Sequence, residues 1–89
     1  MLELYKEEIS SLVNSKILFD EPLKKHTTFG VGGLASIFIY PSSIDDLKKI
    51  LKYSFKNNIK IFFMGSGSNM LISDDGFNGI VICLRKSFK

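Results

Sequence analysis

Hydrophobic residues recur every three or four positions in two stretches of the chain. The first stretch runs from Leu2 to Val13 and has charged residues between its apolar ones. The second follows Pro41, where Ser42 or Ser43 can cap a helix because an aspartate stands three residues after each serine. Its apolar positions are Ile44, Leu47, Ile50, Leu51 and Phe55, and Lys48, Lys52 and Lys56 lie opposite. This spacing predicts two amphipathic helices, the second ending at Asn57 and Asn58.

Short runs of β-branched and aromatic residues predict strands between turn residues. They cover residues 35–40, 60–64, 69–73 and 80–84. The apolar run Ile17 to Phe19 is stopped at Pro22, and residues 22–33 are expected to be exposed, irregular backbone. Strand, capped helix and strand in succession form a crossover unit. We therefore expect an α+β fold of α/β-like character, with a β-α-β-β core preceded by an N-terminal helix.

Composition limits the chain to one small domain. A chain of 89 residues with 45% hydrophobic content can fold, but it buries only about 60 to 65% of its unfolded surface, so its stability margin is thin. The net charge is +3, and 11 of the 12 basic residues are lysines. Because lysine recognises bases and phosphates less specifically than arginine, we expect no nucleic-acid partner.

The single cysteine and single histidine exclude two further classes of site. Cys83 has no second cysteine for an internal disulfide, and with His26 it is too little for a zinc site, so no metal is expected. No run approaches the roughly 20 apolar residues that span a bilayer, so no membrane partner is expected. These observations favour a cytoplasmic protein.

Two glycine-rich segments are the candidate chemistry of the chain. Gly65 to Asn69 follows a predicted strand and offers consecutive backbone N–H groups with little side-chain bulk, as in an anion-binding nest. A plain tight turn is an equal alternative, because the segment lacks the Lys-Ser/Thr ending of a P-loop. Gly30 to Gly33, preceded by Thr27 and Thr28, offers a second backbone approach or a simple connector. His26 is expected to be a solvated loop residue without a catalytic partner.

Four blocks of sequence, taken together, resemble one family. The blocks are Glu21-Pro22-Leu23, then His26-Thr27-Thr28-Phe29 with Gly32-Gly33, then Gly65 to Leu71, then Asp74-Asp75-Gly76-Phe77 with Gly79. Their order and spacing are similar to those of UDP-N-acetylenolpyruvoylglucosamine reductase, also called UDP-N-acetylmuramate dehydrogenase, a flavoenzyme of bacterial peptidoglycan synthesis. The resemblance covers roughly Asp20 to Leu84, which corresponds to the opening portion of a much longer family chain.

The resemblance implies a fold, a cofactor and a reaction. It implies that residues 20–89 are the truncated first lobe of an FAD-binding domain of the vanillyl-alcohol oxidase and p-cresol methylhydroxylase type, after a helix and lead-in over residues 1–19. In the family NADPH is the hydride donor, and a nucleotide sugar, UDP-N-acetylglucosamine enolpyruvate, is reduced. The resemblance implies FAD-binding residues at Gly65, Ser66, Gly67, Ser68, Asn69, Thr28, Gly32 and Gly33. Gly30 stands where the family often has a basic residue, so a contact made by that side chain is absent.

The catalytic arginine, glutamate and serine of the family lie beyond the opening lobe. Arg85 does not match the catalytic position, so we expect no catalytic residue in this chain and no independent activity. An alternative function is a non-catalytic module that binds a phosphate, a nucleotide or a protein. Because a sheet in so small a chain should keep an open edge, we also expect self-association through that edge.

Overall fold

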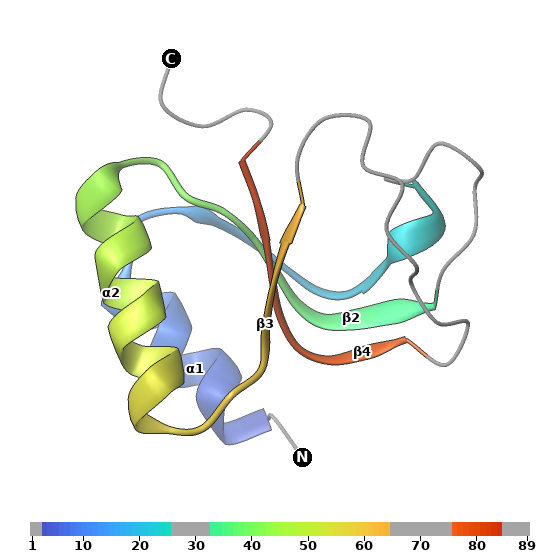
Figure 1. The fold of residues 1–89 in the computed structure, drawn as a ribbon, viewed down its shortest axis with the longest axis horizontal. Coiled ribbons are helices and arrows are strands. Elements are labelled where there is room, and N and C mark those ends of the chain that lie inside the picture. Colours follow the sequence, from blue (N-terminus) through green and yellow to red (C-terminus); the bar gives the residue numbers. More distant parts are fainter. Residues whose placement is uncertain (1–2, 26–32, 65–75, 85–89) are drawn as a thin grey trace.

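The computed structural model describes residues 3–25, 33–64 and 76–84. In these ranges the chain forms two α-helices, one short 3-10 helix and four strands (Figure 1). In chain order they are α1 (Glu3–Leu12), β1 (Lys16–Pro22), η1 (Leu23–Lys25), β2 (Leu34–Tyr40), α2 (Ile44–Lys56), β3 (Ile61–Met64) and β4 (Phe77–Cys83). The predicted mixed α+β class is confirmed. No helix in the described ranges is long and apolar enough to cross a membrane.

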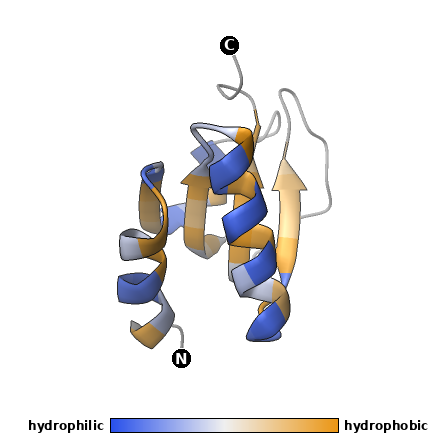
Figure 2. Cartoon of the chain, turned by 90° about the vertical axis from the view of Figure 1, so that its left-hand side faces the viewer, coloured by the Kyte–Doolittle hydropathy of each residue, from blue (hydrophilic) through white to orange (hydrophobic). Residues whose placement is uncertain are grey.

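The four strands form one sheet in the order β1-β2-β4-β3. β1 is antiparallel to β2, whereas β2, β4 and β3 run parallel to one another. β4 therefore lies between the two strands that α2 connects, so the crossover through α2 passes over one strand position. Figure 2 shows α1 and α2 side by side on the same face of the sheet.

Alternate side chains of the central strands divide the core into two layers, as the pleat of a strand requires. Ile37 and Ile39 of β2 face the helices, whereas Phe38 between them faces the other side of the sheet. The helix-side layer contains Ile9, Val13, Ile37, Ile39, Ile50, Ile80 and Ile82. The opposite layer contains Leu23, Ala35, Phe38, Met64, Val81 and Cys83. Both faces of the central strands β2 and β4 are therefore apolar, which is why their sequences form nearly continuous hydrophobic runs.

The N-terminal cap of α2 confirms the helix start that the serine and aspartate pattern predicts. Ser43 is the capping residue, and its Oγ accepts a hydrogen bond from the backbone N–H of Asp46 at 3.1 Å. Ser42 has a different role, because its hydroxyl lies 3.1 Å from the Asp46 carboxylate. Asp46 thus faces the neighbouring chain segments and not the Ser43 backbone N–H that a complete capping box would use.

The predicted apolar face of α2 is only partly correct. Ile50 is fully buried, but Ile44 is 58% exposed and Phe55 is 88% exposed. Ser54 takes an inward position instead, and its hydroxyl donates to the carbonyl of Ile50 at 2.8 Å. The line of residues that includes Ile44 and Phe55 lies beside β3, which is the last strand of the sheet. No described strand extends beyond it to cover these two side chains.

β1 is a strand where the sequence predicts an apolar run followed by a loop. Its register pairs Phe19 with Ile37 and Glu21 with Ala35, and skips Asp20, which has a positive φ of 52°. Pro22 is tolerated because β1 is an edge strand. The Asp-Glu-Pro cluster suggested that the apolar run stops and a loop follows, whereas pairing with β2 over most of its length maintains the strand.

The other predicted strands are close to those observed, with one correction. β2 and β3 match the predictions for residues 35–40 and 60–64 within one residue at each end. The last strand covers Phe77–Cys83, so it begins before the predicted residue 80. Gly79, which belongs to the fourth family block, lies inside this strand, where a Cβ would come within 2.5 Å of the Lys60 carbonyl oxygen. The strand predicted over residues 69–73 lies outside the described residues.

Candidate functional site

Gly33 is the one residue of the predicted FAD site that the structure describes. Thr28, Gly32 and the glycine loop, Gly65, Ser66, Gly67, Ser68 and Asn69, lie outside the described residues, as does His26. The strand ends that flank these segments are described, and they define where each segment begins or returns.

The glycine loop begins at a buried point on the carboxyl edge of the sheet. Met64, the last residue of β3, is fully buried, and its carbonyl oxygen accepts a hydrogen bond from the N–H of Leu84 at 3.0 Å. β3 is parallel to β4, with Met64 opposite Cys83. In open α/β sheets ligands bind beyond the carboxyl ends of parallel strands. The start of the predicted nest thus has a position that suits ligand binding.

Gly33 lies at the other end of the sheet, beside Gly76. The carbonyl oxygen of Gly33 accepts a hydrogen bond from the N–H of Leu23 at 2.8 Å. Gly76 has a φ of 93°, and a Cβ there would lie 2.5 Å from the carbonyl oxygen of Leu34. A side chain at position 76 is therefore excluded both by its backbone conformation and by the close approach of β2. In the sequence Gly76 belongs to the fourth family block.

The described ends of the two glycine-rich segments are separated by the length of β4. Ala35, two residues after Gly33, lies opposite Phe77, whereas Met64 lies opposite Cys83. A strand rises about 3.3 Å per residue, so these two ends of the sheet are about 20 Å apart. The structure therefore does not bring Gly33 to the residue from which the glycine loop departs.

The N-terminus of α2 also lies on the carboxyl edge, but it already has anionic partners. Asp45 and Asp46 stand in its first turn, and Ser43 accepts one of its N–H groups. The Asp46 side chain is 6% exposed and accepts hydrogen bonds from Ser15 Oγ at 2.6 Å and from the N–H of Asn14 at 3.0 Å. Because carboxylates repel a phosphate, this helix end is unsuited to the pyrophosphate site that a Rossmann fold places at a helix N-terminus.

The environment of Asp46 keeps it charged. The hydrogen bond from Ser15 is the main cause that lowers the pKa of Asp46 below its ordinary value of 3.8, although burial opposes this shift. The Ser42 hydroxyl, the Asn14 N–H and the positive charge of Lys49 lower the pKa further. The carboxylate thereby joins the end of α1, the start of β1 and the start of α2. Its role is to hold these segments together.

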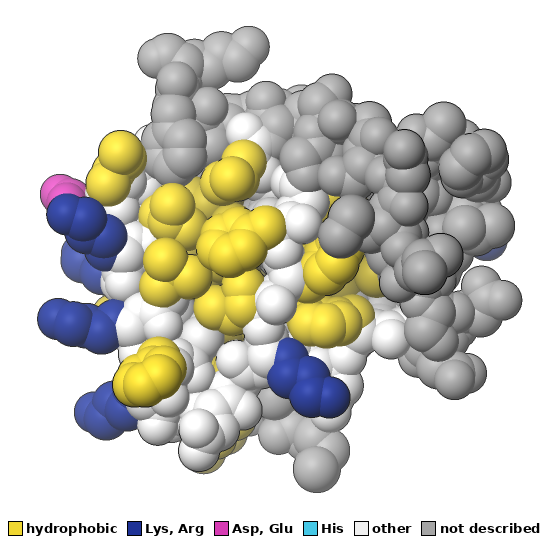
Figure 3. All heavy atoms as spheres, viewed as in Figure 1, with side chains coloured by type: hydrophobic (Ala, Val, Ile, Leu, Met, Phe, Trp, Pro, Cys, Tyr) yellow, Lys and Arg dark blue, Asp and Glu magenta, His cyan; other side chains and the backbone are white. Residues whose placement is uncertain are grey.

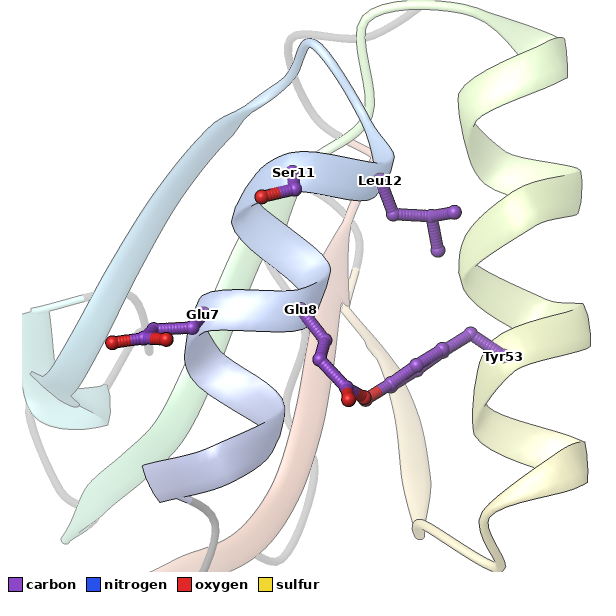
Figure 4. A pocket seen from close by; sticks show the side chains of 5 residues that line it. All are labelled: Glu7, Glu8, Ser11, Leu12 and Tyr53. Atoms are coloured by element: carbon purple, nitrogen blue, oxygen red, sulfur yellow. The ribbon is translucent and has the colours of Figure 1, made fainter.

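A hollow of about 480 Å³ between the two helices is a further candidate site among the described residues. Figure 4 shows its lining, which consists of Glu7, Glu8, Ser11, Leu12 and Tyr53. The Tyr53 hydroxyl donates a hydrogen bond to Glu8. Burial, and then this contact with Glu8, raises the pKa of Tyr53 above its ordinary value. Two carboxylates at this hollow make it a poor site for a diphosphate.

Comparison with known proteins identifies the class of protein to which the chain belongs. Residues 35–89 match the FAD binding domain family, and the chain belongs to that family. This match covers the crossover unit, the glycine loop and β4, so it supports FAD as the cofactor of this class.

The chain is also similar to particular flavoenzymes. It is 39% identical over 80 residues to the UDP-N-acetylenolpyruvoylglucosamine reductase of Syntrophus aciditrophicus (strain SB), covering 90% of this chain and 26% of the relative. It is 39% identical over 87 residues to the reductase of the same name in Alkaliphilus oremlandii (strain OhILAs), covering 98% of this chain and 29% of the relative. The resemblance inferred from the four sequence blocks is confirmed. The chain spans about a quarter of the length of these relatives.

Proposed function

We propose that this chain is the first FAD-binding segment of a UDP-N-acetylenolpyruvoylglucosamine reductase. The observation that carries the proposal is that residues 35–89 match an FAD binding domain while about nine-tenths of the chain or more aligns with reductases of that name. In the complete protein the hydride donor is NADPH and the substrate is UDP-N-acetylglucosamine enolpyruvate. The short chain by itself is inactive, because the catalytic groups of the family lie outside it.

The role of this chain in that protein is to bind the cofactor. FAD, when bound, supplies the hydride-transfer chemistry. Gly65 to Asn69 bind its pyrophosphate through backbone N–H groups, with Thr28, Gly32 and Gly33 nearby. Two observations support this assignment: β3 delivers the glycine loop to the carboxyl edge of a parallel sheet, and the N-terminus of α2 is already occupied by carboxylates. The second observation disagrees with a Rossmann fold, which places the pyrophosphate at a helix N-terminus.

The test uses a protein in which the cofactor site is complete. This chain replaces the aligned region of the Alkaliphilus oremlandii reductase, and bound flavin is measured by its absorbance after purification. Gly67→Val blocks the backbone approach sterically, and Ser66→Asp repels the pyrophosphate. Each change should weaken flavin retention by roughly 2 to 4 kcal/mol, because one or two charge-assisted hydrogen bonds are lost. Purified variant protein should therefore be nearly colourless.

Lys52→Ala is the matched control, because Lys52 is an exposed residue of α2 and lies outside the glycine loop. It should retain flavin as the parent does. NADPH oxidation that depends on the enolpyruvyl substrate then tests the reaction. If folded Gly67→Val protein retains flavin like the parent, the glycine loop is only a turn and the assignment of the site is wrong.

A further inference from the structure

The two edge strands of the sheet differ in how well they are protected against pairing with another strand. β1 carries Lys16, Asp20, Glu21 and Pro22, and the positive φ of Asp20 interrupts its regular backbone. Charges, proline and irregular backbone are the features that keep edge strands from associating. β3, at the other edge, reads Ile-Phe-Phe-Met and has none of them. Among the described residues no strand pairs with its outer side.

An apolar surface continues from this unprotected edge onto the flank of α2. Phe55 is 88% exposed, Ile44 58% and Phe63 47%, and Leu47 and Leu51 beside them are half-buried. Figure 3 shows hydrophobic side chains gathered over α2 and β3, with lysine side chains along the outer side of α2. We call this surface, formed by Ile44, Leu47, Leu51, Phe55, Ile61 and Phe63, the α2/β3 surface. Large exposed apolar side chains that gather in this way mark an interaction site.

We propose that the α2/β3 surface is an interface for a second copy of this chain, in which the β3 strands of the two copies pair in antiparallel orientation. A two-fold axis perpendicular to the sheet would extend the four strands into one sheet of eight, with both α2 helices on the same face. The apolar flanks of the two helices then face each other. This inference goes beyond the proposed function, because it concerns the 89-residue chain alone.

The distribution of charge agrees with this pairing. The strand that pairs contains no charged residue, and antiparallel pairing places Lys60 of one copy at the opposite end of the ribbon from the same residue of the other. Figure 3 shows lysine side chains along the outer side of α2, and Lys48 and Lys52 line a hollow together with Leu51, so they border the α2/β3 surface. Among the described residues no strand pairs with the outer backbone groups of β3, and these groups favour a polypeptide over an anionic lipid surface, because lipid offers no ladder of hydrogen-bond partners.

The size of the surface sets the strength of the association. The exposed parts of Phe55 and Phe63 amount to roughly 200 to 340 Å², if a large aromatic side chain buries about 150 to 250 Å² in full. The other members of the surface add to this area, but a stable interface buries about 800 Å² on each partner. We therefore expect a reversible dimer whose population depends on concentration.

Sedimentation velocity on the 89-residue chain over a range of concentrations tests the proposal. The parent chain should pass from monomer to dimer, and Phe63→Lys and Phe55→Lys should each weaken the dimer at least tenfold. Phe55 is nearly fully exposed, so its replacement cannot unfold the chain, which circular dichroism checks for every variant. The matched controls are Phe19→Lys on β1 and Leu4→Lys on α1. In the parent chain Phe19 is 40% exposed and Leu4 is 68% exposed, and both variants should dimerise like the parent.

Three results would overturn the proposal. The first is a parent chain that stays monomeric up to about 1 mM, a concentration at which even an association of about −4 kcal/mol is visible. The second is a dimer that both control variants weaken as much as Phe63→Lys does. The third is a different occupant of the surface. One such result is a monomer that binds vesicles of anionic phospholipid through Phe55. The other is a monomer whose β3 amides become protected only when the remaining part of a reductase relative is attached.

Discussion

Replacing Asp46 with alanine tests the idea that one buried carboxylate holds three segments of the fold together. Its Oδ2 atom accepts hydrogen bonds from Ser15 Oγ at 2.6 Å, the Asn14 N–H at 3.0 Å and Ser42 Oγ at 3.1 Å. These donors lie between α1 and β1 and just before α2. The alanine variant leaves all three without the charged acceptor. It also removes one of the two negative charges in the first turn of α2.

The free energy of unfolding that Asp46→Ala should lose depends on which of the three donors water can reach in the variant. A hydrogen bond to a charged group contributes about 1.5 to 3 kcal/mol, but Ser42 is exposed and Ser15 half-exposed, so water replaces much of what they lose. The Asn14 N–H is part-buried and loses most of its bond. A negative charge at a helix N-terminus adds about 0.3 to 1 kcal/mol. We expect a loss of about 2 to 4 kcal/mol, which is a large share of the roughly 4 to 13 kcal/mol expected for a chain of this length.

Urea unfolding followed by circular dichroism measures this loss directly, and thermal unfolding should show a Tm lowered by roughly 8 to 32 °C. Asp45→Ala is the matched control, because Asp45 is exposed in the same helical turn and should cost only about 0.3 to 1 kcal/mol. If the two variants lose equal stability, Asp46 acts only on the helix dipole, and the proposed link between the three segments is refuted.

The pH dependence gives an independent check with a defined sign. The pKa of Asp46 is lower in the folded chain than its ordinary value of 3.8, so its stabilising contribution is complete above that value and is lost as the pH falls below it. The stability difference between the parent and Asp46→Asn should thus be constant near neutral pH. It should shrink as the pH falls below 3.8, and a difference that grows in acid would contradict the lowered pKa.

Two further substitutions test local features of the fold. Gly76→Ala should destabilise the chain by at least about 1 to 2 kcal/mol, because φ at residue 76 is positive and a Cβ there would approach the Leu34 carbonyl. Urea unfolding measures this loss of stability. A loss below about 0.5 kcal/mol would show that β2 and β4 can separate there. Ser54→Ala should change stability by less than about 0.5 kcal/mol, because alanine favours the helix and the lost hydroxyl donates only to the Ile50 carbonyl four residues earlier. A loss above about 1 kcal/mol in urea unfolding would indicate that the Ser54 hydroxyl has a further hydrogen-bond partner.

Local sequence predicted the elements whose signals are complete within a few residues. The cap of α2 is one example, since a serine followed three residues later by an aspartate satisfies the helix end without help from elsewhere. β2 is another, because β-branched and aromatic residues covered on both faces leave a continuous apolar run. The family blocks are recognised by their order and spacing along the chain, and the similarity to reductases over nine-tenths of the chain or more confirms the resemblance.

Tertiary contacts decided the features that local signals could not determine. β1 continues to Pro22 only because β2 offers it a partner, and the cluster from Asp20 to Pro22 would otherwise predict the end of an apolar run and a loop. Phe55 has helical spacing suited to a buried face, yet it is exposed because the sheet ends at β3 beneath that flank of α2. Asp46 showed only its capping spacing in the sequence, whereas its partners Asn14 and Ser15 lie about 30 residues away and meet it only in the fold. Sequence spacing determines which residues can share a face, but the neighbouring elements determine whether that face is covered.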